Sequence, residues 1–171
     1  SVQKMILSNE ETNRKKAIME LLPYQKKDFY SILKEMAPMP VTIRLLDPPL
    51  HEFLPSQKNT LLIKSLAKSM RVTEKQIHNR IIDLFEINPM LGHRGCRLAI
   101  SFPEITEMQV EAILTASAKL ILEGKKPKPE IMIPLISNVK EFNHQKKIAK
   151  NIATKIETKY KIKIKYKIGT M

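Results

Sequence analysis

Several residue types that define well-known classes of small protein are scarce in this chain of 171 residues. It has one cysteine, no tryptophan, four glycines and 5% aromatic residues. A single cysteine cannot form an internal disulfide, so disulfide-rich secreted folds are excluded and a reducing, cytoplasmic location is expected. No stretch approaches the ~18 apolar residues that predict a membrane-spanning helix, and no apolar signal-peptide core follows a basic start. We therefore expect a soluble domain with no membrane partner.

Acidic residues are also scarce compared with basic ones. Thirty lysines and arginines oppose seventeen aspartates and glutamates, which gives a net charge of +13. The excess is concentrated from Ile121 onward, where thirteen lysines accompany four glutamates. A positive field of this kind favours anionic partners such as nucleic acid, phosphorylated metabolites or acidic lipid. A solvated lysine surface is the simpler alternative, and the composition leaves both open.

Apolar residues are plentiful, at 43% of the chain, and their spacing predicts alternating helices and strands. Helices are expected over residues 10–36 with a break at Pro23, and over residues 61–70, 74–85, 103–122 and 139–157. Buried strands are expected over residues 41–46 and in "PEIMIPLIS", and an alternating strand in "KYKIKIKYKIGTM".

The order of these elements predicts an α/β fold, because buried strands that alternate with amphipathic helices form parallel sheets. Three parallel strands cannot close a barrel and leave an apolar edge open, so they are expected to be part of a larger sheet. Two residue pairs have the spacing of a helix capping box, Thr73 with Gln76 and Ser101 with Glu104. Gly124 is expected to end the helix over residues 103–122.

Arg44 lies in the middle of "VTIRLLD", a stretch that otherwise has the pattern of a buried strand. An unpaired charge in such a position is unfavourable, so Arg44 needs a partner. One interpretation is an ion pair with Asp47 or Glu52. The other is an anionic ligand, and this stretch alone does not decide between them.

The segment "NPMLGHRGCRLAIS", residues 88–101, contains a histidine and the single cysteine of the chain. Structural zinc sites usually need four ligands, and His93 with Cys96 has no second cluster to complete one. A nucleophilic Cys96 activated by His93 is a further alternative, but the sequence suggests no group to orient the histidine. Most lone cysteines are small buried residues, and this is the simpler interpretation of Cys96.

The same segment also has the composition of an anion-binding loop. Gly92 and Gly95 would let the backbone approach a ligand closely. Arg94 and Arg97 carry planar guanidinium groups that suit phosphate or carboxylate. This interpretation is the one that uses most of the residues present.

Two long motifs resemble the phosphoenolpyruvate/pyruvate-binding domain of the pyruvate, phosphate dikinase family, which is related to phosphotransferase-system enzyme I and phosphoenolpyruvate synthase. They are "PVTIRLLDPPLHEFLP" and "NPMLGHRGCRLAISFPEITEMQVEAI". The flanks "LLPYQKKDFYSILKEM", "PEIMIPLISNVKEF" and "YKIGTM" agree as well, so the similarity covers nearly the whole chain. The resemblance implies a partial (β/α)8 TIM barrel, roughly its first half, with residues 47–100 forming one long βα excursion.

The resemblance also implies a site. Arg44 and Arg94 match the family residues that grip the phosphoryl group of phosphoenolpyruvate, where fixed guanidinium groups stabilise developing charge. For both to reach the barrel mouth, residues 97–101 are expected to form a short helical turn, with Cys96 packed inside the excursion. The last strand is expected to begin only near Tyr166.

The resemblance finally implies what the chain does not supply. Residues 1–171 would be an incomplete phosphoenolpyruvate/pyruvate-binding barrel domain, with the nucleotide-binding and phosphohistidine domains absent. Magnesium serves the parent enzyme, but its ligands are expected beyond Met171, so this chain alone is not expected to hold it. The chain would then be a fragment of an enzyme that catalyses the reaction ATP + pyruvate + phosphate = AMP + phosphoenolpyruvate + diphosphate, and alone it is expected to be inactive. Its expected partners are phosphoenolpyruvate or pyruvate and the missing enzyme segments.

The alternative is a basic anion-binding or nucleic-acid-binding protein that uses the C-terminal lysine-rich segment. Nucleic acid is disfavoured, because Tyr160 and Tyr166 alternate with the lysines and would lie on the opposite face, away from any base to be stacked.

Overall fold

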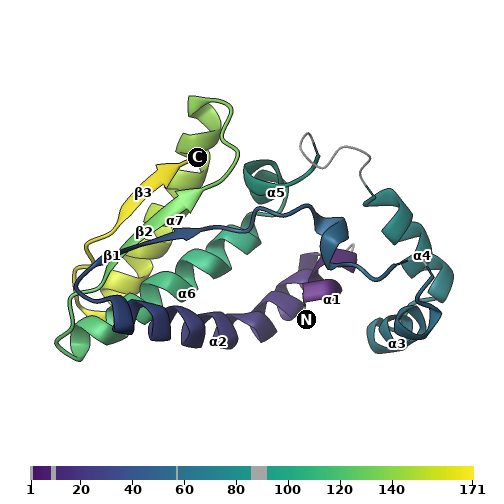
Figure 1. Ribbon diagram of the computed structural model, residues 1–171, viewed down its shortest axis with the longest axis horizontal. Helices are drawn as coiled ribbons and strands as arrows, with labels where there is room; N and C mark the ends of the chain where they lie inside the picture. The colour runs from purple at the N-terminus through teal and green to yellow at the C-terminus, as the bar shows by residue number, and fades with distance from the viewer. Residues whose placement is uncertain (1, 9–10, 57, 86–91) are drawn as a thin grey trace.

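The computed structural model describes residues 2–8, 11–56, 58–85 and 92–171. It combines long helices with a small sheet (Figure 1). The elements are α1 (Val2–Leu7), α2 (Glu11–Met36), β1 (Pro40–Arg44), the 3-10 helix η1 (Leu50–Phe53), α3 (Thr60–Met70), α4 (Glu74–Asp83), α5 (Gly95–Ser101), α6 (Pro103–Leu122), β2 (Lys128–Ile133), α7 (Val139–Tyr160) and β3 (Lys167–Thr170). Within the described ranges, no helix is long and apolar enough to span a membrane.

The three strands form one parallel sheet in the order β1–β2–β3, which confirms the predicted α/β fold. Ile43 lies opposite Ile131, and Ile131 lies opposite Ile168. In Figure 1, α6 and α7 lie along one face of this sheet, and α2 packs against α6. The main core fills the space between sheet and helices. Its buried residues include Ile43, Val110, Ile113, Leu114, Ile131, Ile133, Ala149, Ile152 and Ile156.

Most helix boundaries agree with the sequence pattern, and one predicted cap is wrong. Thr73 and Gln76 form the expected capping box at the start of α4. Ser101 is not a cap: it belongs to α5, where its hydroxyl donates to the carbonyl of Arg97, and the residue before α6 is Phe102. Glu104 instead forms an ion pair with Arg14, which links α6 to α2. Local spacing could not reveal this long-range partner.

The break predicted at Pro23 is also wrong, because α2 continues through it from Glu11 to Met36. A proline inside a helix removes one backbone hydrogen bond. Buried side chains on both sides of Pro23, such as Leu22 and Leu33, hold the helix in place. Burial along this face offsets the lost hydrogen bond. Residue 10, where the prediction placed the start of this helix, lies outside the described residues.

The lysine-rich end of the chain is strand only in its last part. The alternation from Tyr160 onward predicts a longer strand than is present, because Tyr160 is the last residue of α7 and β3 begins at Lys167. The narrower expectation of a start near Tyr166 is confirmed. Between these elements, Ile164 is buried and Lys163 is exposed, so the connection follows the surface with one apolar anchor.

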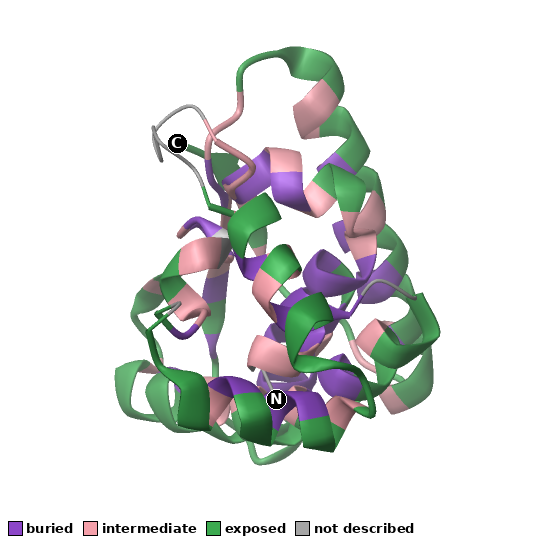
Figure 2. Cartoon of the chain, turned by 90° about the vertical axis from the view of Figure 1, so that its right-hand side faces the viewer, coloured by how far each residue is buried: buried purple, intermediate pink, exposed green. Residues whose placement is uncertain are grey.

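The segment between β1 and α6 forms a helical lobe of its own. Helices α3 and α4 pack their apolar faces together and against Leu7 of α1. Figure 2 views the molecule from this end and shows exposed residues on the outer surfaces of the helices and buried ones between them. The described part of the chain between β1 and α6 thus contains η1, α3, α4 and α5, and α5 leads into α6.

Candidate functional site

The carboxyl end of β1 carries the first candidate residue, Arg44. Its side chain is 53% exposed, so the sequence-based expectation of a buried arginine is wrong. Side chains alternate between the two faces of a strand, and it is Ile43 that faces the core. Arg44 therefore lies on the opposite face of the sheet from Ile43, open to solvent.

Asp47 follows three residues later and is almost fully buried, at 4% exposure. The chain leading to it is held from two sides. The backbone N–H of Leu45 donates to the carbonyl of Met132 over 3.0 Å, and that of Leu46 donates to the side chain of Gln109 over 2.8 Å. These contacts to β2 and α6 fix the position of the Asp47 carboxylate at the end of the sheet.

Arg94 reaches this carboxylate from a position 47 residues further along the chain. Its Nη2 donates to Oδ2 of Asp47 over 2.9 Å, and its Nε donates to the Asp47 carbonyl over 3.1 Å. Nη1 of Arg44 lies 3.5 Å from the same Oδ2. The structure thus brings the two candidate arginines together on one buried aspartate. Of the two carboxylates considered for Arg44, Asp47 is the partner.

Gly95 allows this close approach. Its φ of +54° is in the left-handed region that favours glycine. A Cβ atom here would lie 3.0 Å from Cδ1 of Leu135 and 3.2 Å from Oδ1 of Asp47, which is too close for a relaxed contact. The next backbone N–H, that of Cys96, donates to the carbonyl of Pro134 over 3.0 Å. The start of α5 is therefore fixed directly on the end of β2.

Arg97 and His93 stabilise the segment itself. Nη1 of Arg97 donates to the carbonyl of Gly92 over 3.0 Å. Nε2 of His93 lies 2.9 Å from the hydroxyl of Ser101, and its ring lies 5.8 Å from the ring of Phe102. The two arginines of this segment therefore have different partners: Arg94 contacts Asp47, whereas Arg97 binds the backbone of its own segment at Gly92. The first part of the motif, residues 88–91, lies outside the described residues.

Cys96 is completely buried, and this burial raises the pKa of its thiol to about 11. Near neutral pH almost none of it is thiolate, the form that attacks electrophiles. The interpretation of Cys96 as a packed residue of the excursion is confirmed. The segment over Gly95–Ser101 is helical, as expected.

The ends of the other two strands complete the surroundings of Arg44. The hydroxyl of Thr170 donates to the carbonyl of Ile133 over 3.1 Å, and the backbone N–H of Met171 reaches the same carbonyl over 3.3 Å. This pairing places Sδ of Met171 3.9 Å from Nη1 of Arg44. The carboxyl ends of all three parallel strands therefore meet at the arginines.

The donor set of this site does not suit magnesium, which needs several oxygen ligands. Oδ2 of Asp47 is engaged by two guanidinium groups, and Oδ1 of the same carboxylate is a single buried oxygen without a hydrogen-bond partner. The part of the chain that the structure describes has no group of three metal-ligating side chains.

The sequence singled out Arg44 and Arg94 as candidates but not Asp47, the residue on which they meet. Asp47 was considered only as a partner of Arg44, and its two hydrogen bonds to Arg94 were not expected. The one available signal is its place between a strand and the double proline of "LDPP". Gln109, which holds the backbone of Leu46, gave no signal because it lies in a helical face remote in sequence.

Comparison with known proteins identifies the family of the chain. The family described as "PEP-utilising enzyme, PEP-binding domain" matches residues 2–171. Similar proteins include the chloroplastic pyruvate, phosphate dikinase of Mesembryanthemum crystallinum (46% identical), pyruvate, phosphate dikinase 1 of Arabidopsis thaliana (46%) and pyruvate, phosphate dikinase of Giardia intestinalis (45%). In each case the match covers 100% of this chain but only 18% or 19% of the relative. Since the family match extends over nearly every residue, the chain belongs to the PEP-utilising enzymes and corresponds to their PEP-binding domain.

Proposed function

We propose that this chain binds phosphoenolpyruvate through Arg44 and Arg94 at the carboxyl end of its parallel sheet. The observation that carries this proposal is that Nη1 of Arg44 and Nη2 of Arg94 both reach Oδ2 of Asp47. The description of the matching family as a PEP-binding domain supports this choice of ligand. Two guanidinium groups on one carboxylate leave a net positive charge, which attracts an anion to the same place.

The two arginines are suited to different parts of this task. Arg94 is only 17% exposed and makes two hydrogen bonds to Asp47, so it offers its remaining N–H groups in a fixed direction. Arg44 is half exposed and only loosely paired, so most of its donors can turn toward a ligand. A planar guanidinium can donate two parallel hydrogen bonds to a phosphoryl group. Fixed donors of this kind also stabilise the charge that spreads over the phosphoryl oxygens during transfer.

The larger assembly is also a proposal. We infer that the sheet is the first part of a (β/α)8 barrel, since β1, β2 and β3 are parallel, occur in chain order and alternate with helices on one face. Active sites of such barrels lie at the carboxyl ends of the strands, which is where Arg44 and Arg94 meet. In the complete dikinase this domain would serve the interconversion of ATP, pyruvate and phosphate with AMP, phosphoenolpyruvate and diphosphate.

Binding without turnover is what we expect of these 171 residues alone. The acidic group closest to the two arginines is Asp47, and both guanidinium groups engage its carboxylate. The Cys96 thiol is buried and has a raised pKa. Neither group is therefore placed to transfer a proton to an adjacent ligand.

The test is calorimetric titration of the chain with phosphoenolpyruvate. Arg44→Ala should weaken binding by at least about tenfold, because each charge-assisted hydrogen bond contributes about 1.5–3 kcal/mol. Arg94→Lys should weaken it as well, since lysine keeps the charge but not the planar donor pair. Lys163→Ala is the control that should bind normally, because Lys163 is 89% exposed and lies before β3, at the opposite end of the sheet from the two arginines. Unchanged affinity in both arginine variants would refute the proposed site.

A further inference from the structure

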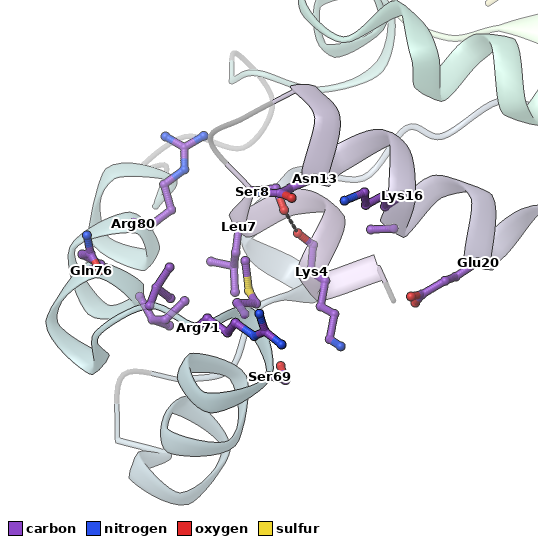
Figure 3. Close-up of a pocket in the computed structure, with 14 residues that line it drawn as sticks. Lys4, Leu7, Ser8, Asn13, Lys16, Glu20, Ser69, Arg71, Gln76 and Arg80 are labelled. Atoms are coloured by element: carbon purple, nitrogen blue, oxygen red, sulfur yellow. Dashed lines mark hydrogen bonds between the residues drawn. The ribbon is translucent and has the colours of Figure 1, made fainter.

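A pocket lies away from the two arginines, between the N-terminal helices and the helical lobe. It has a volume of about 490 Å³, within the range of small-molecule sites. Figure 3 shows the side chains that line it, which come from α1, from the first half of α2, from the end of α3 and its connection to α4, and from α4 itself. Neither Arg44 nor Arg94 contributes to it. This pocket is therefore separate from the proposed phosphoenolpyruvate site.

The charges of this pocket are strongly unbalanced. Four of its lining residues are basic, namely Lys4, Lys16, Arg71 and Arg80, whereas Glu20 is the only acidic one among the described lining residues. Within the described ranges none of the four basic residues forms a salt bridge. Nε of Arg80 is buried and finds no hydrogen-bond partner there. Elsewhere in the same structure, comparably buried arginines such as Arg14 and Arg94 do have carboxylate partners.

Three neutral polar side chains of the pocket already make hydrogen bonds within the protein. The hydroxyl of Ser8 donates to the carbonyl of Lys4 over 2.6 Å, and that of Ser69 donates to the carbonyl of Leu66 over 2.9 Å. The side-chain oxygen of Gln76 accepts the capping hydrogen bond from Thr73. An uncharged polar ligand would therefore find few free donors. An anion would find the basic side chains.

The pocket also has an apolar side, formed by Leu7, Val72 and Ile77. In Figure 3 the charged ends of Lys4 and Arg71 extend to the same side of the pocket, and the guanidinium of Arg80 extends to another. A ligand with one anionic end and one flat apolar end would match this division. Inorganic phosphate alone would leave the apolar side in contact with water.

We propose that this pocket is a second ligand site, which binds an organic phosphate of the size of a nucleoside monophosphate. Its phosphate contacts Lys4 and Arg71, and its apolar part lies against Leu7 and Val72. Lys16 contributes positive charge from α2. Because the lining comes from both the N-terminal helices and the helical lobe, such a ligand would hold these two parts of the chain together.

Arg71 offers an unusually clean test. It ends α3 in the left-handed conformation, with φ of 56°, so Arg71→Gly removes the guanidinium and relieves backbone strain at the same time. Lys161 is a matched control, because it ends α7 in the same conformation, with φ of 55°, and lies outside the pocket. Both glycine variants should fold and unfold at temperatures no lower than the parent chain.

The 171-residue chain and these variants would be titrated by calorimetry with adenosine 5′-monophosphate and with adenosine, which differ only in the phosphate group. We expect the monophosphate to bind the parent chain and Lys161→Gly alike, Arg71→Gly at least about tenfold more weakly, and adenosine to bind none of them measurably. Binding should persist in Arg44→Ala, which separates this site from the phosphoenolpyruvate site.

Four results would overturn the proposal. One is equal affinity of the parent chain and Arg71→Gly for the monophosphate. Another is adenosine binding as tightly as the monophosphate, which would remove the role of charge. The third is the absence of monophosphate binding up to about 1 mM. Loss of binding in Arg44→Ala with retention in Arg71→Gly would assign the ligand to the other site and would equally refute this one.

Discussion

The two ends of the sheet are both basic, but they are built differently. At the carboxyl end, the guanidinium groups of Arg44 and Arg94 meet at Asp47, whose side chain is 6% exposed. At the amino end, the connection between α7 and β3 carries lysines on the surface, and Lys163 is 89% exposed. The comparison teaches that positive charge is held in two ways in this molecule. At the carboxyl end a buried carboxylate fixes the guanidinium groups, whereas at the amino end the ammonium groups lie on the solvated surface.

The acidic residues at the two ends show the same contrast. Asp47 accepts hydrogen bonds from a guanidinium group and so holds a side chain in place. The Glu157 carboxylate accepts a hydrogen bond from the backbone N–H of Ile164 over 2.9 Å and another from the ammonium group of Lys163 over 3.1 Å. The backbone hydrogen bond has the larger effect on the pKa of this carboxyl. One carboxylate organises a possible ligand site, whereas the other fastens the chain between a helix and a strand.

Asp47→Asn should disrupt the arginine cluster at the carboxyl end of the sheet and have the largest effect on stability. Removing one partner of a buried ion pair leaves Arg94 uncompensated, so we expect a loss of about 3 kcal/mol in the free energy of unfolding. Urea unfolding monitored by circular dichroism measures it. Glu130→Gln is the control at the other end of the strands, because its partner Lys167 is 81% exposed. Such a solvent-screened surface pair should change the free energy of unfolding far less than the buried pair does. Equal losses in the two variants would contradict the comparison.

Gly95→Ala should destabilise the chain by about 2–3 kcal/mol, since it adds both backbone strain and a close contact with Leu135 and Asp47. Gly124→Ala separates these two causes. Gly124 also has a positive φ, of 78°, but nothing lies within 4 Å of the added Cβ. Gly124→Ala should therefore lower the free energy of unfolding by only about 1 kcal/mol, from backbone strain alone. If thermal unfolding shows the same shift for both, the close packing at the carboxyl end is not what demands glycine.

Glu157→Gln should make stability at the amino end less dependent on pH. The hydrogen bond from Ile164 and the charge of Lys163 lower the pKa of the Glu157 carboxyl from its ordinary value. A lowered native pKa stabilises the fold above the ordinary range of the carboxyl, and this stabilisation is lost as the pH falls through the lowered value. In urea unfolding, the free energy of unfolding of the parent chain should be larger than that of the variant at about pH 7. The two values should approach each other at about pH 3. A difference that is the same at both pH values would contradict this role.

Nucleic-acid binding at the lysine-rich end should be the weakest effect. Lys161, Lys163 and Lys165 are exposed, whereas Tyr160 and Tyr166 pack partly against the core and offer no free ring for stacking. Random-sequence DNA should shift in a gel only at low ionic strength, because such binding depends on released counterions. A complex with DNA that persists at near-physiological ionic strength would support the nucleic-acid alternative.

The local elements of this fold were predictable because local rules govern them. The start of α6 at Pro103 and the capping box of Thr73 follow from residues close together in sequence. The continuous helix through Pro23 was not predictable, because the packing that sustains it comes from α6. The exposure of Arg44 was missed for a related reason. A short apolar run does not say which of its alternating faces is covered.

By itself the sequence determined the order of helices and parallel strands, the family to which the chain belongs, and the two arginines, since each depends on a pattern or a motif within one stretch. Tertiary structure alone decided that Arg44 and Arg94 share Asp47. Their meeting requires a long helical excursion to return to the sheet, where the Cys96 N–H binds the Pro134 carbonyl and Gly95 leaves room for the carboxylate. The basic pocket beside α1 and α2 depends on the same folding back, because no single stretch of the chain contains its walls.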